Sequence, residues 1–197
     1  MLSGSEAEYM LMLEPYQTTI VSERLILRSM TPPFLQASLT GDRARAEELM
    51  ELTIPDEWFE ETELIALRLK DLQRDPELQP WLLRAIGLRE QGRMIGHIGF
   101  HTQPDPPYLA NLAPGGIEFG YTIFSPFRRH GYAYEAAQAL MGWAREQHSV
   151  SRFVVAISPQ NVPSLELARK LGFVRIGSQI DEEEGIEDIF ELQQAAF

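Results

Sequence analysis

A group of residues suited to binding an anion stands at the predicted start of a helix. The stretch SPFRRHGYAYEAAQAL, residues 125–140, places Arg128, Arg129 and Gly131 directly before a segment with helical spacing. The first amides of a helix have no intrahelical partners and carry partial positive charge, and a glycine lets a phosphate approach the backbone closely. Arginine adds charge-assisted hydrogen bonds. A capped surface helix with solvated arginines is the alternative interpretation of this pattern.

Other common signatures of a phosphate or metal site are absent from the sequence. It has neither the G-x-x-x-x-G-K-[ST] motif of nucleotide hydrolysis nor the G-x-G-x-x-G motif of dinucleotide binding. His97 and His101 share one face of a predicted strand, but at this spacing they lie too far apart for easy joint ligation. The chain has no cysteine, which excludes disulfides, thiolate zinc sites and a cysteine nucleophile. We therefore expect no metal.

A possible substrate contact lies in the segment IPDEWF, residues 54–59. Its aromatic pair stands beside acidic residues, so Glu57 and Trp58 are candidate substrate-binding residues. The alternative is that the tryptophan anchors a packed loop, because loops carry function but tryptophan is usually buried for packing.

The hydrophobic pattern predicts the elements that position these residues. Alternating residues indicate a strand at 20–29, and Gly92 indicates a hairpin between segments 81–90 and 94–102. Further strands are expected at 117–124, 152–158, 173–177 and 186–192, and helices at 42–52, 59–73, 131–147 and 163–171. Strands around two late helices predict one mixed α/β (α+β) domain over residues 20–197, after an N-terminal extension of residues 1–19.

The charge balance limits the classes of partner. The formal net charge is −12 and the sequence pI is about 4.8, whereas a general nucleic-acid binder needs a broad basic face. No apolar run approaches the ~20 residues of a membrane span, and the acidic N-terminus is a poor signal peptide. We expect a cytoplasmic protein that binds neither nucleic acid nor membrane.

The helix entry resembles motif A of the GNAT superfamily of acetyl-CoA-dependent N-acetyltransferases, written [QR]-x-x-G-x-[GA]. It stands here as Arg128 to Ala133, and the following residues resemble the GYATEA form of the ribosomal-protein N-acetyltransferase branch. Three more segments match this branch in order along the chain: ERLILR at 23–28, IEFGYTI at 117–123 and NVPSLELARKLGF at 161–173. Together these matches cover most of the chain from about residue 20, except for residues 42–80.

The resemblance implies a fold and a cosubstrate. The fold is a single-domain GNAT-like one, with a mixed, mostly antiparallel central sheet whose splayed strands are flanked by helices. The cosubstrate is acetyl-CoA, with its pantetheine arm along the strand that ends near Ile123 and an oxyanion-binding amide on the same strand. Asn161 is expected to bond the arm, or else to be a turn asparagine. The pyrophosphate is assigned to the helix entry, namely Arg128, Arg129, His130, Gly131, Tyr132 and Ala133.

The resemblance also implies catalytic residues. Some members place a catalytic glutamate on the strand before motif A, so Glu118 is the expected base; a solvent-facing strand residue is the alternative. Many members use a tyrosine on the helix after Asn161 as the acid, but Ala168 stands at that position. Ser164, which can instead be a helix cap, and Tyr121 are the replacement candidates.

The expected function is transfer of an acetyl group to a primary amine, on a protein N-terminus or a small molecule, by direct attack in a ternary complex. A non-catalytic acyl-CoA sensor on the same fold is the first alternative, and an acidic interaction domain is the second. The oligomeric state is open between a monomer and a homodimer.

Overall fold

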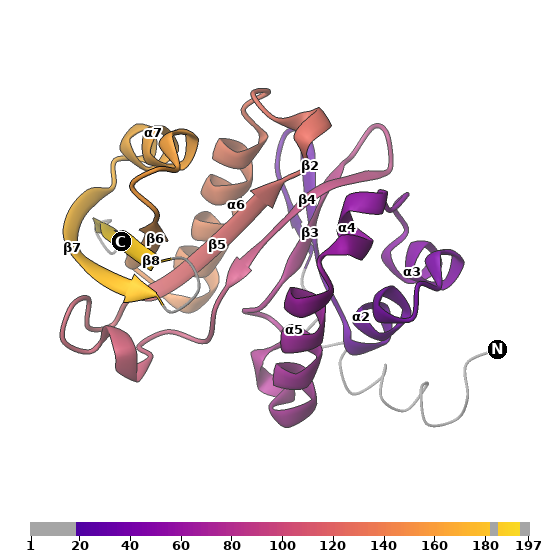
Figure 1. Cartoon of the computed structure of the whole chain (residues 1–197), viewed down its shortest axis with the longest axis horizontal. Helices are drawn as coiled ribbons and strands as arrows, with labels where there is room; N and C mark the ends of the chain where they lie inside the picture. Colours follow the sequence, from indigo (N-terminus) through magenta and orange to yellow (C-terminus); the bar gives the residue numbers. More distant parts are fainter. Residues whose placement is uncertain (1–18, 182–184, 194–197) are drawn as a thin grey trace. The chain divides into compact units, whose positions relative to one another are not determined.

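The computed structural model describes residues 19–181 and 185–193, and the chain divides into two compact units after His97. Each unit combines strands with helices (Figure 1), in agreement with the predicted α/β class. The expected N-terminal extension lies outside the described residues except for Thr19, which begins the first strand. Within the described residues, no helix has both the length and the apolar character needed to cross a membrane.

Along the sequence, the first unit begins and ends with a pair of strands, and its helices lie between the two pairs. Its strands are neighbours in the order β1 to β4, and β1, β2 and β3 pair antiparallel. The strands are β1 (Thr19–Val21), β2 (Leu25–Ser29), β3 (Arg84–Leu88) and β4 (Arg93–Phe100), the last of which runs into the second unit. The helices are α2 (Pro32–Leu39), α3 (Arg43–Met50), α4 (Asp56–Glu60), α5 (Thr62–Arg74) and the 3₁₀ turn η2 (Pro76–Leu78).

The single strand predicted at 20–29 is in fact a hairpin of β1 and β2. The chain reverses at Ser22, whose hydroxyl accepts a hydrogen bond from the Leu25 amide at 3.2 Å, so that Ile20 pairs with Leu27. The predicted alternation on β2 is confirmed, because Leu25 and Leu27 are completely buried. The prediction missed the turn because Ser22–Arg24 contains neither glycine nor proline, the residues that most clearly mark turns.

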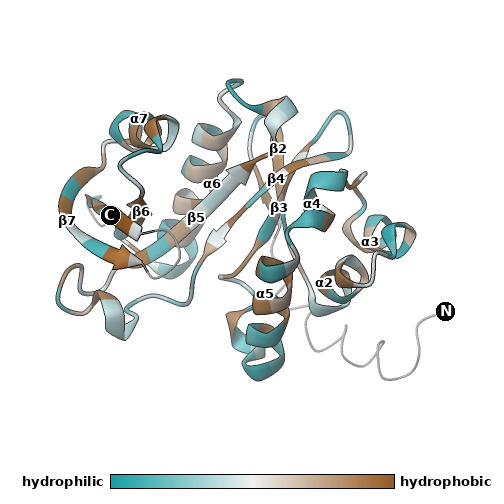
Figure 2. Ribbon diagram, in the orientation of Figure 1, coloured by the Kyte–Doolittle hydropathy of each residue, from teal (hydrophilic) through white to brown (hydrophobic). Residues whose placement is uncertain are grey.

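The helices of the first unit pack on one another through their apolar sides. α2 contacts α3, α4 and α5, and α5 buries Ile65, Leu69 and Leu72. In Figure 2 the ribbon of α5 carries both brown and teal stretches, in keeping with its amphipathic sequence. The segment expected to be a loop at 54–59 contains α4, so residues 42–74 are more helical than predicted.

The second unit consists of a mixed sheet with two long helices. β5 (Ile117–Ile123) pairs parallel with β6 (Arg152–Ile157), while β6 and β8 (Gly185–Gln193) and then β8 and β7 (Val174–Asp181) pair antiparallel. Their order is β5-β6-β8-β7. The helices are α6 (Tyr132–His148) and α7 (Val162–Leu171), with 3₁₀ turns η3 (Pro107–Leu109) and η4 (Ser125–Phe127).

Small residues and aromatic rings form the core of this unit. α6 packs against β5 and buries five side chains on one side, namely Ala136, Ala137, Leu140, Met141 and Ala144. Phe100 stands 6.2 Å from Phe119 and 6.5 Å from Phe153, and Phe119 stands 6.2 Å from Phe173 (ring centroids). These contacts fix β5 and β6 beside the start of β7, which positions the site between β5 and α7.

Candidate functional site

Strands β5 and β6 form a fork. Their parallel pairing is confined to Ile117 with Phe153 and Glu118 with Val154, although both described strands continue beyond these pairs. A cavity of about 170 Å³ lies where they diverge, lined by residues of both strands and of α7. The predicted splay of the central strands is therefore confirmed. Backbone groups inside such a fork can bond to an extended, amide-containing ligand as a neighbouring strand would.

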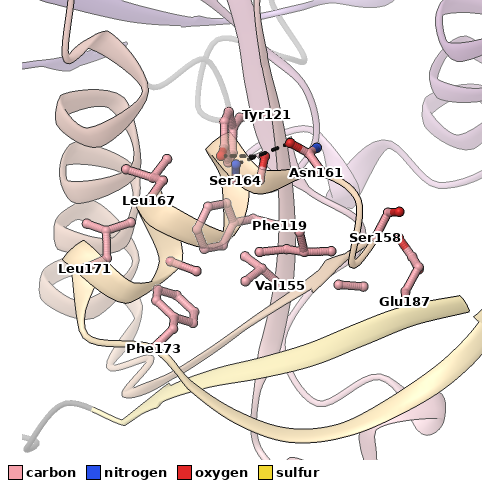
Figure 3. A pocket seen from close by; sticks show the side chains of 14 residues that line it. Phe119, Tyr121, Val155, Ser158, Asn161, Ser164, Leu167, Leu171, Phe173 and Glu187 are labelled. Carbon is pink, nitrogen blue, oxygen red and sulfur yellow. Dashed lines mark hydrogen bonds between the residues drawn. The ribbon is translucent and has the colours of Figure 1, made fainter. Parts of the chain in front are cut away.

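A hydrogen-bonded row of three residues lies at one end of this cavity (Figure 3). The Tyr121 hydroxyl donates to Ser164 Oγ at 3.0 Å, and the Ser164 backbone amide donates to Asn161 Oδ1 at 3.2 Å. Asn161 thereby caps the N-terminus of α7, which corrects the alternative that Ser164 is the cap. The serine hydroxyl instead connects α7 to β5. The structure thus brings three predicted site residues together.

Tyr121 is a protonated phenol at neutral pH. Burial raises its pKa above the ordinary value of 10.0, and the hydrogen bond to Ser164 opposes this only in part. A neutral phenol bonded to a serine hydroxyl can supply a proton along the pair. The rest of the cavity, below the pair in Figure 3, is lined by apolar side chains of β5, β6, α7 and the chain after it, namely Phe119, Val155, Leu167, Leu171 and Phe173.

The loop between β5 and α6 has the backbone geometry of a close approach. Gly131 adopts φ +79° at the position that caps α6, and Arg129 adopts φ +64°, which is uncommon for a residue with a side chain. No side-chain cap occupies the first amides of α6 among the described residues. Arg128 Nε donates to the Ile123 carbonyl at 2.8 Å and so ties the loop to the end of β5.

A larger cavity of about 780 Å³ opens in front of this loop. It shares Tyr121, Asn161, Ser164 and Leu167 with the cavity in the fork, so the two form a continuous site. Most residues predicted to bind the cofactor line the larger cavity, namely Ile123, Arg128, Arg129, Gly131, Tyr132, Ala133, Asn161 and Ser164. These residues therefore lie around one cavity, and their assignment to a cofactor stays a prediction.

His130 is the predicted cofactor residue that lies outside the lining of both cavities. Its Nδ1 is 2.7 Å from the Arg128 carbonyl, and its ring stacks on Tyr132 with centroids 5.6 Å apart. Through these contacts His130 stabilises the conformation of the loop between β5 and α6.

Several residues of the larger cavity had no role in the sequence interpretation, and two of them contact each other. Lys170 Nζ lies 4.3 Å from the ring centroid of Tyr134, and both residues line the cavity. They join the last turn of α7 to the first turn of α6. Lys170 belongs to the matched segment 161–173, and Tyr134 directly follows the segment 128–133. Their sequence positions alone gave no sign of a contact, because only the fold brings the two side chains together.

Glu118 lies outside the lining of both cavities. Since alternate residues of a strand face opposite sides, Glu118 and Tyr121 point to opposite faces of β5. The glutamate is buried, so the alternative of a solvent-facing strand residue is wrong. Its Oε2 stands 3.6 Å from Nδ1 of His101.

The two candidate substrate residues belong to the first unit. Trp58 has no exposed surface, stacks on Phe34 with centroids 5.7 Å apart, and donates from Nε1 to Ser38 Oγ at 2.8 Å. This position favours the packing interpretation over a substrate contact. Glu57 is half-buried in the first turn of α4.

The described residues contain no group of three or more histidine or acidic residues arranged to hold a metal ion. His97 belongs to the first unit and stands with Nε2 3.9 Å from Glu61 Oε1. This contact is the main reason that the pKa of Glu61 is lowered.

Comparison with known proteins gives a family match over most of the chain. Residues 24–174 match the model described as an acetyltransferase (GNAT) domain. The uncharacterized N-acetyltransferase YjdG of Bacillus subtilis is 29% identical over 158 residues, which are 78% of this chain and 88% of YjdG. A second uncharacterized N-acetyltransferase of this organism, YnaD, is 28% identical over 124 residues, or 63% of this chain and 65% of YnaD.

Solved structures show the same fold. A GNAT-family acetyltransferase from Bordetella pertussis aligns with a TM-score of 0.64 and 22% identity over 89% of this chain and 99% of its own. The ribosomal L7/L12 alpha-N-protein acetyltransferase RimL, in complex with coenzyme A, aligns with a TM-score of 0.63 and 19% identity over 91% of this chain and 100% of its own. The predicted GNAT-like fold class is confirmed.

Proposed function

The chain belongs to the acetyltransferase (GNAT) family, and from this premise we propose that it transfers the acetyl group of acetyl-CoA to a primary amine by direct attack in a ternary complex. The observation that carries this proposal is the fork between β5 and β6, which opens into a cavity bordered by a cationic helix entry. These features provide separate places for a pantetheine arm and a pyrophosphate.

The residues present fit coenzyme A. Arg129 is exposed and, within the described part of the chain, has no ion-pair or hydrogen-bond partner for its guanidinium, so it is available to a phosphate. The first amides of α6 point their partial positive charge at the same cavity. The fork then continues from this anion site past Tyr121 and Ser164, where the thioester would lie.

The proposed chemistry uses opposite faces of β5. An ammonium is not a nucleophile, so a base must first remove a proton from the acceptor, and Glu118 is the carboxylate assigned to that step. A backbone amide near Ile123 is assigned to the oxyanion of the tetrahedral intermediate. The leaving thiolate takes a proton from Ser164, which the Tyr121 hydroxyl replaces through their 3.0 Å hydrogen bond.

For the acceptor, we propose a free α-amino group of a peptide or protein. The structural neighbours include the ribosomal L7/L12 alpha-N-protein acetyltransferase RimL and a ribosomal-protein-serine acetyltransferase from Vibrio cholerae. The net charge of −12 also favours the approach of a cationic acceptor. A small-molecule amine is the alternative acceptor.

A panel of four acceptors tests the proposal. Thiol release from acetyl-CoA is followed with a peptide bearing a free N-terminus, the same peptide blocked at its N-terminus but containing lysine, spermidine and an aminoglycoside. We expect turnover above the no-acceptor rate, fastest with the free N-terminus. Tight binding of coenzyme A without turnover of any amine would contradict catalysis and support an acyl-CoA sensor instead.

A further inference from the structure

His101 lies directly beside the buried carboxylate of Glu118 in the second unit. The residue follows the last residue of β4, and its backbone amide donates to the Glu118 carbonyl at 2.9 Å, which sets its register against β5. Its Nδ1 stands 3.6 Å from Glu118 Oε2. This separation is an ion-pair distance that brings a protonated imidazole and a carboxylate into favourable contact.

Gly120 creates the space in which the imidazole lies. A Cβ at residue 120 would stand 3.0 Å from His101 Nε2, so a side chain at this position would press on the ring. Glu118, Gly120 and Thr122 share one face of β5, because alternate residues of a strand do so. The ring therefore covers the strand between the carboxylate and Thr122, a residue of the larger cavity.

The exposure of the two side chains separates their possible roles. The Glu118 side chain is only 10% exposed, whereas the His101 side chain is 41% exposed. A bulky acceptor that approaches from solution therefore contacts the His101 imidazole more readily than the Glu118 carboxylate. Imidazole is also one of the side-chain groups that most often act as a general base.

We infer that His101 is the group that takes the proton from the acceptor amine, and that Glu118 holds and stabilises the resulting imidazolium. This inference rests on the proposed acetyltransferase function and refines the role of its base. Nε2 accepts one proton from the bound ammonium, and the freed nitrogen lone pair forms the bond to the thioester carbonyl carbon. The carbon–sulfur bond then breaks and the thiolate is protonated from Ser164. The attacking nitrogen releases its second proton to solvent as the amide forms, solvent returns one proton to the Tyr121–Ser164 pair, and His101 gives its proton to solvent, so that one proton is released in each turnover.

The test compares His101→Ala and His101→Gln with the wild type, using the fastest acceptor of the four-member panel. Another of the chain's four histidines provides the matched control: His148→Ala removes an exposed imidazole at the end of α6. Coenzyme A binding is measured for every variant to establish that the cofactor site is intact. General base catalysis contributes about 10²–10⁴-fold, so we expect kcat to fall by at least about 100-fold in both His101 variants.

Two further readouts distinguish a base from a structural residue. Added imidazole should restore part of the rate of His101→Ala but should not accelerate the wild type or Glu118→Gln. The loss should also shrink at alkaline pH, where the acceptor amine is already neutral. Gly120→Ala, which presses on the imidazole, should cause part of the same loss.

Three outcomes would overturn the inference. One is a wild-type rate in His101→Ala; another is a loss of rate that imidazole does not relieve and that is the same at every pH. Each leaves acetyl transfer by the wild type intact, so it refutes the role of His101 and not the proposed function. The third is a wild type that transfers acetyl to none of the four amines, which refutes both.

Discussion

The hydrogen bond between Tyr121 and Ser164 should be measurable as a coupling energy. Tyr121→Phe removes the donor hydroxyl and keeps the ring, while Ser164→Ala removes the acceptor and leaves the α7 cap on Asn161 in place. A hydrogen bond between uncharged groups contributes about 1 kcal/mol to stability. For a chain of 197 residues, each single variant should therefore lower Tm by about 2–4 °C.

The measurement is a double-mutant cycle followed by denaturant unfolding. Because both single variants break the same bond, the double variant should lose about 1 kcal/mol less than the sum of the two single losses. Kinetics provide the second assay. If Tyr121 supplies its proton through Ser164, kcat should fall in both single variants and fall no further in the double variant, with the KM for acetyl-CoA little changed in Tyr121→Phe.

The pKa of Tyr121 adds a pH dependence with a definite sign. Burial raises this pKa, so the folded phenol ionises at a higher pH than the unfolded phenol, whose pKa is about 10. The neutral phenol's contribution to the free energy of unfolding is fully present below the unfolded pKa of about 10. It is lost as the pH rises through the pKa of the folded protein. Additive unfolding energies, or a kcat unchanged by Tyr121→Phe, would refute the assigned relay.

Two further predictions concern the cofactor loop and the first unit. Arg129→Ala should weaken coenzyme A binding about tenfold to a hundredfold and reduce its salt dependence, because a charge-assisted bond of about 1.5–3 kcal/mol is lost. Binding is measured by calorimetric titration, with Arg175→Ala as the matched control, since Arg175 lies on β7 in an ion pair with Asp188. The control should bind coenzyme A normally, and equal weakening in both variants would contradict the assignment. Trp58→Phe should lower the free energy of unfolding by about 1–3 kcal/mol, because it removes side-chain volume and the hydrogen bond to Ser38, and it should leave kcat per folded molecule unchanged. A rise in the KM for the acceptor alone would instead support Trp58 as a substrate-binding residue.

The sequence predicted those parts of the fold that depend on local pattern. Helix α6 begins after Gly131, and α7 ends at Leu171 before Gly172 in the left-handed conformation, so both lie close to the predicted ranges 131–147 and 163–171. The β1–β2 hairpin was missed because Ser22–Arg24 makes its turn without glycine or proline, and α4 was missed because five residues give too short a period to recognise.

The candidate site was predictable where a motif encodes it and not where tertiary contacts create it. Residues 128–133 are contiguous in sequence, so one motif was enough to predict that they act together, and five of the six line the larger cavity; their binding of a cofactor stays a prediction. By contrast, Tyr121 and Ser164 are separated by 43 residues, and only the packing of α7 beside β5 places their hydroxyls 3.0 Å apart. The contact between His101 and Glu118 depends likewise on pairing after the end of β4, and on a glycine whose role is visible only in three dimensions.

The fork explains how one short strand can serve two reactants. If β5 were paired with β6 along its whole length, residues 119–123 would have their backbone groups bonded to β6, and a pantetheine arm could not bind there. Pairing stops after Glu118, which leaves this part of β5 open on the side of β6. The next residues then alternate: Tyr121 faces the serine that is proposed to protonate the thiolate, while Glu118 and Gly120 face the imidazole proposed to deprotonate the amine. The proposed acid and the proposed base would thus lie on opposite faces of the strand, which would keep either from neutralising the other before the acetyl group is transferred.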